Sequence, residues 1–380
     1  MVIFPKGRAS IIGAMRSNAG RLWDLYCRVV DHHGDAGVCW RLAADLAARG
    51  ERVRLVIDDA APLAFMAPSG APGVQVWAWP GPHASTDGGP PGDVVIEAFG
   101  CALPEVCVAA MLQCCLPPVW LNLEYLSAEA YVERSHGLPS PQANGLDKWF
   151  YYPGFTPRTG GLLREPSIVA ARSAFDRDAW LATRLGLRRL PGERVLSLYC
   201  YDNPSIPALM RSLAGAPTSA LARSTRPEPT LLLLTQGAAQ RQVLQAPQGI
   251  RLHPLPWLSQ ADFDNLLWSC DINFVRGEDS AVRALWAGAP FTWQLYPQHD
   301  GAHFAKLEAL LVQAEASPAT AALWRAWNSA PGAPWPDLPP LGAWQQELLA
   351  WRGRQLEQGD LTSRLIEFVA GRGGGNGAGR

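Results

Sequence analysis

The sequence predicts an α/β protein made of two successive halves, each with its own parallel sheet. Three observations predict this fold. Short apolar runs alternate with helical patterns along both halves of the chain. The pairs Gly160-Gly161 and Pro191-Gly192 bracket the region where one alternating series ends and the next begins. The length of 380 residues, with 48% hydrophobic and 18% charged, favours two domains over one.

The first half opens with a β-α-β unit. Residues 22–30 are apolar enough for a buried strand, and Val38, Leu42 and Leu46 then recur at helical spacing, until Arg49-Gly50 marks a helix C-terminus. The aromatic segment 124–155, which Gly and Pro interrupt, is expected to be a long ordered loop or cleft wall and not a helix and strand. The other elements expected in this half are strands at 53–57, 74–77, 93–99 and 118–123 and a helix at 105–113.

The second half repeats the pattern after an amphipathic helix at 172–187. Its expected elements are strands at 194–200, 230–235, 250–255 and 270–275 and helices at 281–287, 343–351 and 360–369, with surface loops at 217–229 and 331–340. The domain crossing is expected between the regions 158–165 and 191–192. Residues 1–20 are expected to be a loose extension, with translation starting at Met15, and the glycine-rich residues 371–380 a disordered tail.

Bulk composition narrows the class of function. A net charge of -1 and a pI near 6.7 argue against a protein that binds nucleic acid or an anionic membrane. No apolar run approaches the roughly 18 residues of a membrane span. The eight cysteines contain no C-x-x-C pair and no zinc-like spacing, so they are expected to be buried thiols in a reducing cytoplasm.

The stretch that carries most of the chemistry is the turn Asp31 to Val38, which lies between the first predicted strand and helix. Asp31 and Asp35 would repel an anion, so the turn is unlike a glycine-rich phosphate loop. It suits a cation, or a polar group that loses a proton. The alternative is that an Asp here only caps the helix, although capping does not easily explain both residues.

A second strand-to-helix turn, Asp271 to Ser280, has the opposite character. Asp279 or Ser280 can be the N-cap of the following helix, and Arg276 precedes it. Free N–H groups, the positive end of the helix and a guanidinium would then converge, which is typical of a pyrophosphate site. The alternative is an ordinary capped helix with an arginine on the surface.

Other candidate residues follow further strands of the second half. Tyr199 and Tyr201 follow one strand, and Trp257 and Gln260 follow another, at the edge where open α/β sheets bind ligands. The rings of Tyr199, Tyr201 and Trp257 could stack on a nucleobase, which predicts a nucleotide-sugar pocket. Most of the 16 tryptophans, however, are expected to be packing residues. His299 and His303 could share a metal ion at helical spacing, but Asp300 as an N-cap is the simpler explanation.

Several long segments of the chain, in register, resemble the bacterial elongation factor P arginine rhamnosyltransferases, the EarP family. The resemblance extends from about Arg21 to Val369. The segments that carry it are Asp24 to Asp31, Gly34 to Leu42, Trp120 to Glu129, Phe150 to Phe155, Asn273 to Ser280 and Trp293 to Gln298.

The resemblance implies a GT-B glycosyltransferase with two Rossmann-like domains that face each other across a cleft. It implies an inverting transfer of L-rhamnose from dTDP-β-L-rhamnose to an arginine of elongation factor P, which activates that factor to rescue ribosomes stalled at polyproline. The implied domains are an acceptor domain at 21–186, completed by a helix at about 356–370, and a donor domain at 187–355. No cofactor or metal is implied.

The family's essential aspartates correspond to Asp31 and Asp35, and its essential glutamate to Glu278. The donor-site residues carried over by the resemblance are Tyr201, Trp257, Gln260, Arg276, Asp279 and Ser280, with Tyr199 beside them. At Tyr199 and Trp257 the family often has Phe. Glu278 is expected to bind a ribose or rhamnose hydroxyl, or to hold the donor in its reactive pose.

The chemistry of the residues agrees with this function. A guanidinium has a pKa above about 12 and no free lone pair, so its glycosylation needs an anion that holds the group and accepts a proton. Asp31 and Asp35 suit both tasks, one as general base and the other as the orienting group. Two alternatives remain at this point. One is another GT-B enzyme with a different acceptor, such as a heptosyltransferase, and the other is a non-catalytic nucleotide-sugar binding module.

Overall fold

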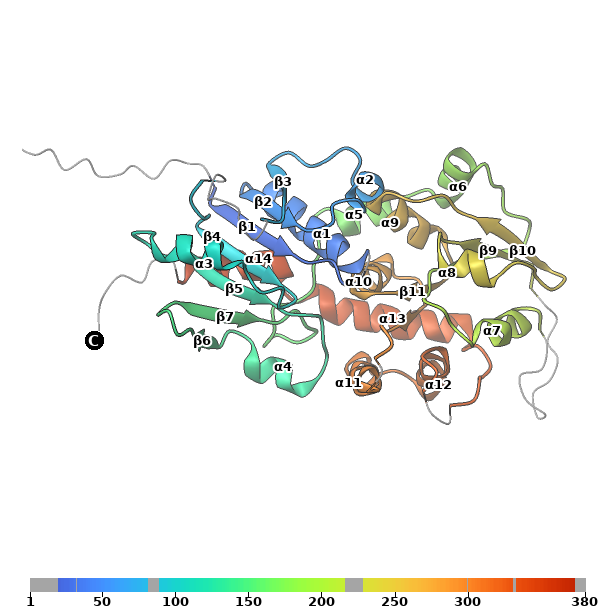
Figure 1. Ribbon diagram of the computed structural model, residues 1–380. Helices are drawn as coiled ribbons and strands as arrows, with labels where there is room; N and C mark the ends of the chain where they lie inside the picture. Colours follow the sequence, from blue (N-terminus) through green and yellow to red (C-terminus); the bar gives the residue numbers. More distant parts are fainter. Residues whose placement is uncertain are drawn as a thin grey trace, which may run out of the picture.

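A computed structural model describes residues 20–31, 33–80, 89–215, 228–298, 300–330 and 333–372. They form two α/β units that lie side by side in Figure 1. Within the described residues, no helix is both long enough and apolar enough to cross a membrane. The predicted extension 1–20, loop 217–229 and tail 371–380 lie almost wholly outside the described residues.

The first unit has a seven-stranded sheet with helices on both faces. Its strands are β1 (Leu22–Cys27), β2 (Arg52–Ile57), β3 (Val74–Ala78), β4 (Val94–Ala98), β5 (Val119–Leu123), β6 (Pro139–Pro141) and β7 (Asp147–Tyr151). Its helices are α1 (Gly34–Ala48), α2 (Leu63–Met66), α3 (Glu105–Leu112), α4 (Ala130–Ser135) and α14 (Leu361–Ala370). The strand order is β3-β2-β1-β4-β5-β7-β6, and every pair is parallel except β6 and β7.

The second unit has a fully parallel sheet in the order β10-β9-β8-β11-β12. Its strands are β8 (Arg194–Leu198), β9 (Thr230–Leu234), β10 (Ile250–Pro254), β11 (Ile272–Arg276) and β12 (Phe291–Gln294). The helices that follow the first unit are α5 (Ile168–Ser173), α6 (Arg177–Leu185), α7 (Ile206–Leu213), α8 (Ala238–Gln242), α9 (Gln260–Ser269), α10 (Glu278–Ala287), α11 (Ala302–Ala314), α12 (Pro318–Trp327) and α13 (Leu341–Leu356).

The central strands of each sheet are buried on both faces, as their continuous apolar runs require. In the first unit, α1 and α14 cover one face and α3 the other, with Leu42 and Leu365 in one core and Met111 in the other. In the second unit, α6 and α9 cover one face, and α7 and α12 the other. Because α5 and α6 pack on the second unit, packing assigns them to that unit, whereas the predicted first domain runs to residue 186.

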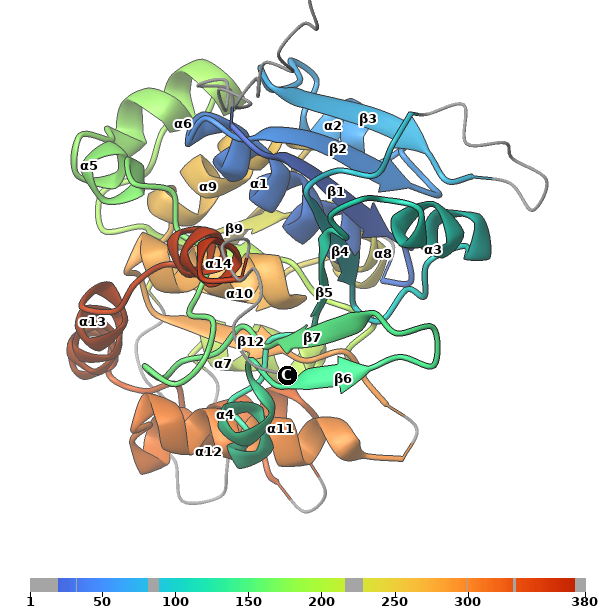
Figure 2. The ribbon, with the colours of Figure 1, turned by 90° about the vertical axis from the view of Figure 1, so that its left-hand side faces the viewer.

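Of the two expectations for 124–155, the long loop is wrong, whereas both ends of the segment do line the cleft. This segment contains α4, β6 and β7, and β7 pairs in parallel with β5. Figure 2 shows β7 and β6 extending one edge of the first sheet. The hairpin turn depends on Gly145, whose φ is +87°, and on Asn144, whose side chain accepts a hydrogen bond from the Leu146 N–H. Aromatic residues are favoured in strands, and Pro is tolerated in the edge strand β6, so the interruptions did not exclude a sheet.

The prediction of one helix at 172–187 is also wrong, because the chain breaks it into α5 and α6. The Asp176 side chain accepts hydrogen bonds from the N–H groups of Asp178 and Ala179, which starts a new helix there. Gly186, in the left-handed conformation, ends α6. A strong internal N-cap therefore outweighed the continuous apolar periodicity.

The expectation that all the cysteines are buried is wrong for three of them. All eight are free thiols, but Cys115 is exposed and Cys107 and Cys114 are half-buried. These three lie in or next to α3, which covers the outer face of the first sheet.

Candidate active site

Two pockets occupy the cleft between the units, and they meet at one point. The first encloses about 710 Å³ and the second about 1060 Å³ of space, part of it open to solvent. Asp31 and Gly34 from the first unit and Gly277 from the second line both pockets. A Cβ on Gly277 would lie 3.6 Å from Asp31 Oδ2, so the two strand-to-helix turns face each other closely. The two pockets therefore adjoin at these residues, where ligands bound in both could meet.

Asp35 holds the first turn together. Its Oδ2 accepts hydrogen bonds from the N–H groups of Val30 (2.8 Å) and Asp31 (2.9 Å), and its side chain is only 3% exposed. Burial raises the pKa of Asp35, and the nearby negative charge of Asp31 raises it further. The hydrogen bonds from the two N–H groups act in the opposite direction and lower it. The N-cap of α1 is His33, and no side chain caps the helix. The simple capping explanation therefore does not apply to either aspartate.

Asp31 links the two units. The Tyr201 hydroxyl, which follows β8, donates a 2.7 Å hydrogen bond to Asp31 Oδ2. Tyr201 lines the second pocket, whereas the other six residues predicted to bind the donor line the first. Asp31 and Asp35 both line the second pocket. The structure thus brings the predicted acidic pair to the meeting point of the pockets.

Glu278, the third predicted catalytic residue, lines the second pocket and not the first. Its Oε2 accepts a 2.8 Å hydrogen bond from the Leu126 N–H of the first unit. Burial raises the pKa of Glu278 to about 8, an effect that the Lys306 charge opposes and the charges of Asp35 and Asp31 increase. The second pocket therefore has three carboxyl groups, of which Glu278 carries a proton below about pH 8 while the pocket is empty.

The raised pKa of Glu278 predicts a pH dependence of stability. Glu278 keeps its proton in the folded chain up to about pH 8 but loses it near 4.5 when unfolded, so the free energy of unfolding falls as pH rises through this window. Glu278→Gln removes this titration. We expect the Tm difference, variant minus wild type, to grow by about 4 °C between pH 5 and pH 8 in thermal melts.

The control is Glu105→Gln, which replaces an exposed glutamate at the start of α3. Its Tm should follow that of the wild type at every pH. A Glu278→Gln difference that stays constant or shrinks as the pH rises would contradict the raised pKa.

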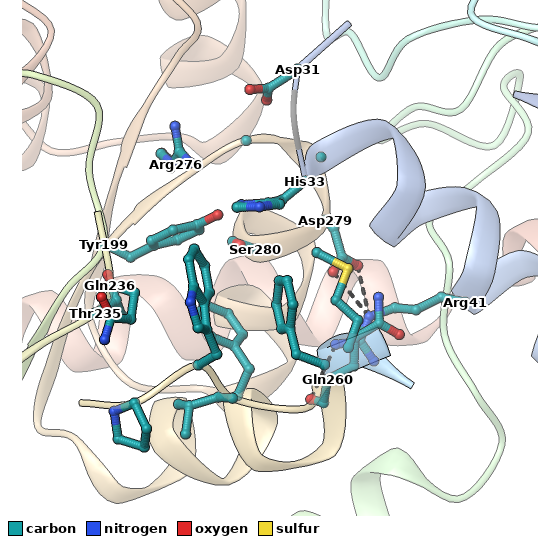
Figure 3. Close-up of a pocket in the computed structure, with 18 residues that line it drawn as sticks. Asp31, His33, Arg41, Tyr199, Thr235, Gln236, Gln260, Arg276, Asp279 and Ser280 are labelled. Carbon is teal, nitrogen blue, oxygen red and sulfur yellow. Dashed lines mark hydrogen bonds and ion pairs between the residues drawn. The ribbon is translucent and has the colours of Figure 1, made fainter. Parts of the chain in front are cut away.

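The first pocket carries positive charge next to aromatic rings. The Arg276 guanidinium lies 4.8 Å from the Tyr199 ring centroid and 4.3 Å from that of Tyr201. Its Nε is buried and has no hydrogen-bond partner among the described residues. Figure 3 shows Arg276, Tyr199 and Ser280 in this pocket, with His33 nearby. An anionic ligand could accept the unused donor.

The start of α10 supplies further donors to the same pocket. The helix has ten residues, and its N-cap is Gly277, whose φ of +71° favours glycine. The predicted N-caps Asp279 and Ser280 are therefore wrong, because both lie inside the first turn. The first N–H groups of a helix have no partner within it, so they and the helix dipole favour an anion here.

Two of the residues predicted to bind the donor sugar nucleotide also make hydrogen bonds to the first unit. The Gln260 Nε2 donates a 2.9 Å hydrogen bond to the Gly37 carbonyl, and Asp279 binds Arg41. Several residues that line the first pocket were not candidates from the sequence, among them Arg41, Phe65, Met66, Thr235, Gln236 and Phe263. Thr235 and Gln236 follow β9, where the strand-end rule that identified Tyr199 could have found them.

The outer end of the first pocket is an aromatic cluster from both units. The Trp257 ring centroid lies 4.7 Å from that of Phe65 and 5.1 Å from that of His33, and Trp257 is 49% exposed. A flat ring could lie against such a surface. No sequence pattern marked Phe65, which reaches the cleft from α2.

Of the two histidines considered as a metal pair, His299 lies outside the described residues. His303 Nδ1 accepts a 3.1 Å hydrogen bond from the Gln298 N–H. The N-cap of α11 is Gly301, so Asp300 is not the cap, although its side chain accepts a hydrogen bond from the Ala302 N–H. Within the described ranges, no three His, Cys, Asp or Glu side chains form a metal-binding group.

Comparison with known proteins gives consistent results. Residues 23–370 match the family model described as elongation factor P (EF-P) rhamnosyltransferase EarP. The protein-arginine rhamnosyltransferase of Pseudomonas aeruginosa is 40% identical over 384 residues, 92% of this chain and 98% of that protein. The protein of the same name from Pseudomonas putida is 43% identical over 387 residues, 91% of this chain and 98% of that protein.

Solved structures agree on the architecture. A structure that explains EarP-mediated arginine glycosylation of translation elongation factor EF-P has a TM-score of 0.60 and 31% identity, and covers 92% of this chain and 99% of its own. The calicheamicin glycosyltransferase CalG4 has a TM-score of 0.50 at 15% identity, covering 93% of this chain and 99% of its own, which supports the fold alone. The predicted fold, GT-B with two parallel-sheet α/β units, is confirmed.

Proposed function

Because the chain belongs to the EarP family of EF-P rhamnosyltransferases, we propose that it transfers L-rhamnose from dTDP-β-L-rhamnose to an arginine side chain of EF-P. The observation that carries the proposal is the meeting of the two pockets at Asp31 and Gly277, one with Arg276 among aromatic rings and the other with Asp35 and Glu278. The modified EF-P would then act on ribosomes stalled at polyproline. Enzyme and acceptor would meet in the cytoplasm.

The second pocket is the proposed site of the acceptor arginine. Asp31, Asp35 and Glu278 give it the charge to hold a guanidinium, and Tyr125 and Phe99 give it an aromatic wall, with ring centroids 4.4 Å apart in a stack. Entry of the guanidinium favours the ionised form of Glu278, so its proton would leave as the acceptor binds. The carboxylate pair Asp31 and Asp35 would accept the proton that the attacking nitrogen loses.

The first pocket is the proposed site of the donor. The arginine nitrogen attacks C1 of rhamnose, the bond from C1 to the diphosphate oxygen breaks, and dTDP leaves with the electron pair. Arg276 and the N–H groups at the start of α10 would neutralise the charge that develops on the diphosphate. This source of positive charge supports the proposal that no metal ion is required. A single displacement inverts the anomeric centre and gives α-rhamnosyl-arginine.

The aromatic cluster predicts how the nucleobase is held. Trp257→Ala is expected to weaken dTDP binding about tenfold, because it removes the ring on which thymine would stack. Trp257→Phe keeps a ring and should lose less than about threefold. Titration calorimetry with dTDP measures both. Equal affinities for wild type and Trp257→Ala would contradict base stacking at this position.

The proposed reaction is tested by incubating the protein with dTDP-β-L-rhamnose and EF-P and weighing EF-P by mass spectrometry. We expect one added deoxyhexose, located on arginine by fragmentation, and α configuration at the anomeric carbon by NMR. EF-P with that arginine changed to lysine is the control and should gain no sugar. Release of dTDP with another acceptor but not with EF-P would favour the alternative, a GT-B enzyme with a different substrate. Binding of dTDP without turnover would favour a non-catalytic module.

A further inference from the structure

Arg41 lies at the centre of a buried charge network between the two units. It comes from α1, is 6% exposed and reaches across the cleft. Its Nε donates a 3.0 Å hydrogen bond to Asp279 Oδ2, and its Nη1 and Nη2 donate to Asp264 Oδ2 (3.2 Å) and Oδ1 (3.1 Å). Arg283 binds the same Asp264 from α10, at 2.8 and 2.7 Å, and also binds Glu165. Asp264 in α9 and Asp279 in α10 both belong to the second unit, so Arg41 joins the first unit to the second.

The bond from Arg41 to Asp279 lies in the wall of the first pocket, which both residues line. Asp279 is in the first turn of α10, directly between Glu278, which lines the second pocket, and Ser280, which lines the first. Its position therefore decides where both neighbours face. Figure 3 shows Arg41 and Asp279 joined in this way at the side of the first pocket.

The first turn of α1 also lies close to the start of α10. Gly37 lies one turn before Arg41, and a Cβ on it would stand 3.5 Å from Asp279 Oδ2 and 3.4 Å from Gln260 Nε2. A glycine inside a helix is normally unfavourable, so its place here fits the close approach of the two helices. The same helix begins with the turn that holds Asp35. Arg41 thus joins the start of α10 to the helix that carries the acidic turn.

We propose that Arg41 is a positioning residue of the transfer reaction, which acts through Asp279 to set the gap between the donor and the acceptor arginine. The inference rests on the proposed function. Arg41 would not touch the reacting atoms. Its bond fixes the first turn of α10, and with it the N–H groups aimed at the diphosphate, relative to the carboxylates that take the proton. Misplacement of reacting groups by about 1 Å can cost 10²-fold in rate.

The test compares Arg41 of α1 with Arg49, the C-cap residue of the same helix. Arg49 is also ion-paired, but its partners Asp45 and Asp360 belong to the first unit, so it holds α14 and not the cleft. Arg41→Met and Arg49→Met are assayed for EF-P rhamnosylation below the Tm of the less stable variant. We expect both to lower the Tm, and only Arg41→Met to lower kcat, by about 30-fold, with dTDP affinity within about threefold of wild type.

The conservative variants give a second comparison. Arg41→Lys keeps one charge near Asp279 but cannot also reach both oxygens of Asp264, so its kcat should lie between those of wild type and Arg41→Met. If Arg41→Met does not fold, Arg41→Lys against Arg49→Lys decides. If the wild-type enzyme is active and the Arg41 and Arg49 variants have equal kcat, the positioning role of Arg41 is overturned and the proposed function is not. A wild-type chain that adds no deoxyhexose would instead overturn the proposed function.

Discussion

Asp35→Asn is expected to lower kcat for rhamnosyl transfer by about 10³-fold, because it removes the negative charge and the basic oxygen from the acidic pair. The asparagine oxygen can still accept hydrogen bonds from the N–H groups of Val30 and Asp31, so the turn should keep its shape. Affinity for dTDP should change by less than about threefold, since Asp35 lines only the second pocket. Single-turnover mass spectrometry of EF-P and calorimetry with dTDP measure the two effects.

The matched control is Asp58→Asn. Asp58 follows β2, is exposed, and its Oδ1 accepts a 2.9 Å hydrogen bond from the Val29 N–H beside the same turn. Asp58 lines neither pocket, so its replacement should leave kcat within about twofold of wild type. A Asp35→Asn variant that loses dTDP affinity but keeps kcat would place Asp35 on the donor side and contradict its proposed role.

Arg276→Met is expected to lower kcat by about 10²-fold or more and to weaken dTDP binding as well. Methionine fills much of the same space between the rings of Tyr199 and Tyr201 but offers neither the charge nor the unused Nε donor. The loss in kcat should exceed the loss in affinity, because the diphosphate carries more charge when the sugar leaves.

Arg325→Met is the control for Arg276→Met, because Arg325 makes an exposed ion pair with Glu308 on the outside of the second unit. Steady-state kinetics with varied dTDP-β-L-rhamnose separate kcat from KM. A variant of Arg276 that raises KM and leaves kcat unchanged would show that Arg276 only binds the donor and does not stabilise its departure.

Local patterns predict the parallel strands of both sheets well, because short apolar runs between turns are read directly from the chain. The failures come from long-range effects. The strand β7 is aromatic and only partly apolar, and it becomes a strand through pairing with β5, whose edge no local pattern reveals. The break between α5 and α6 is local, and the cap at Asp176 is a signal that the periodicity concealed.

The candidate site follows a similar division. Strand ends and acidic turns mark Asp31, Asp35, Arg276 and Tyr199 in the sequence, since a sheet edge collects them. The side of the cleft that Glu278 faces depends on its bond to Leu126 in the other unit, and the aromatic neighbour of Trp257 is Phe65, nearly 200 positions away in the sequence. Contacts of this kind are set by how the two units close, which no single segment encodes.

The helix α14 has a consequence for how the protein is made. Its residues Leu361, Leu365 and Val369 belong to the core of the first unit, although the ribosome adds them after the whole second unit. The amino-terminal sheet would therefore emerge with one face uncovered and stay open to chaperones or misassociation until residues 361–369 are made. The first unit should then become stable only when α14 packs on it. Because α14 follows α13 in the chain, the same step also ties the end of the second unit to the first.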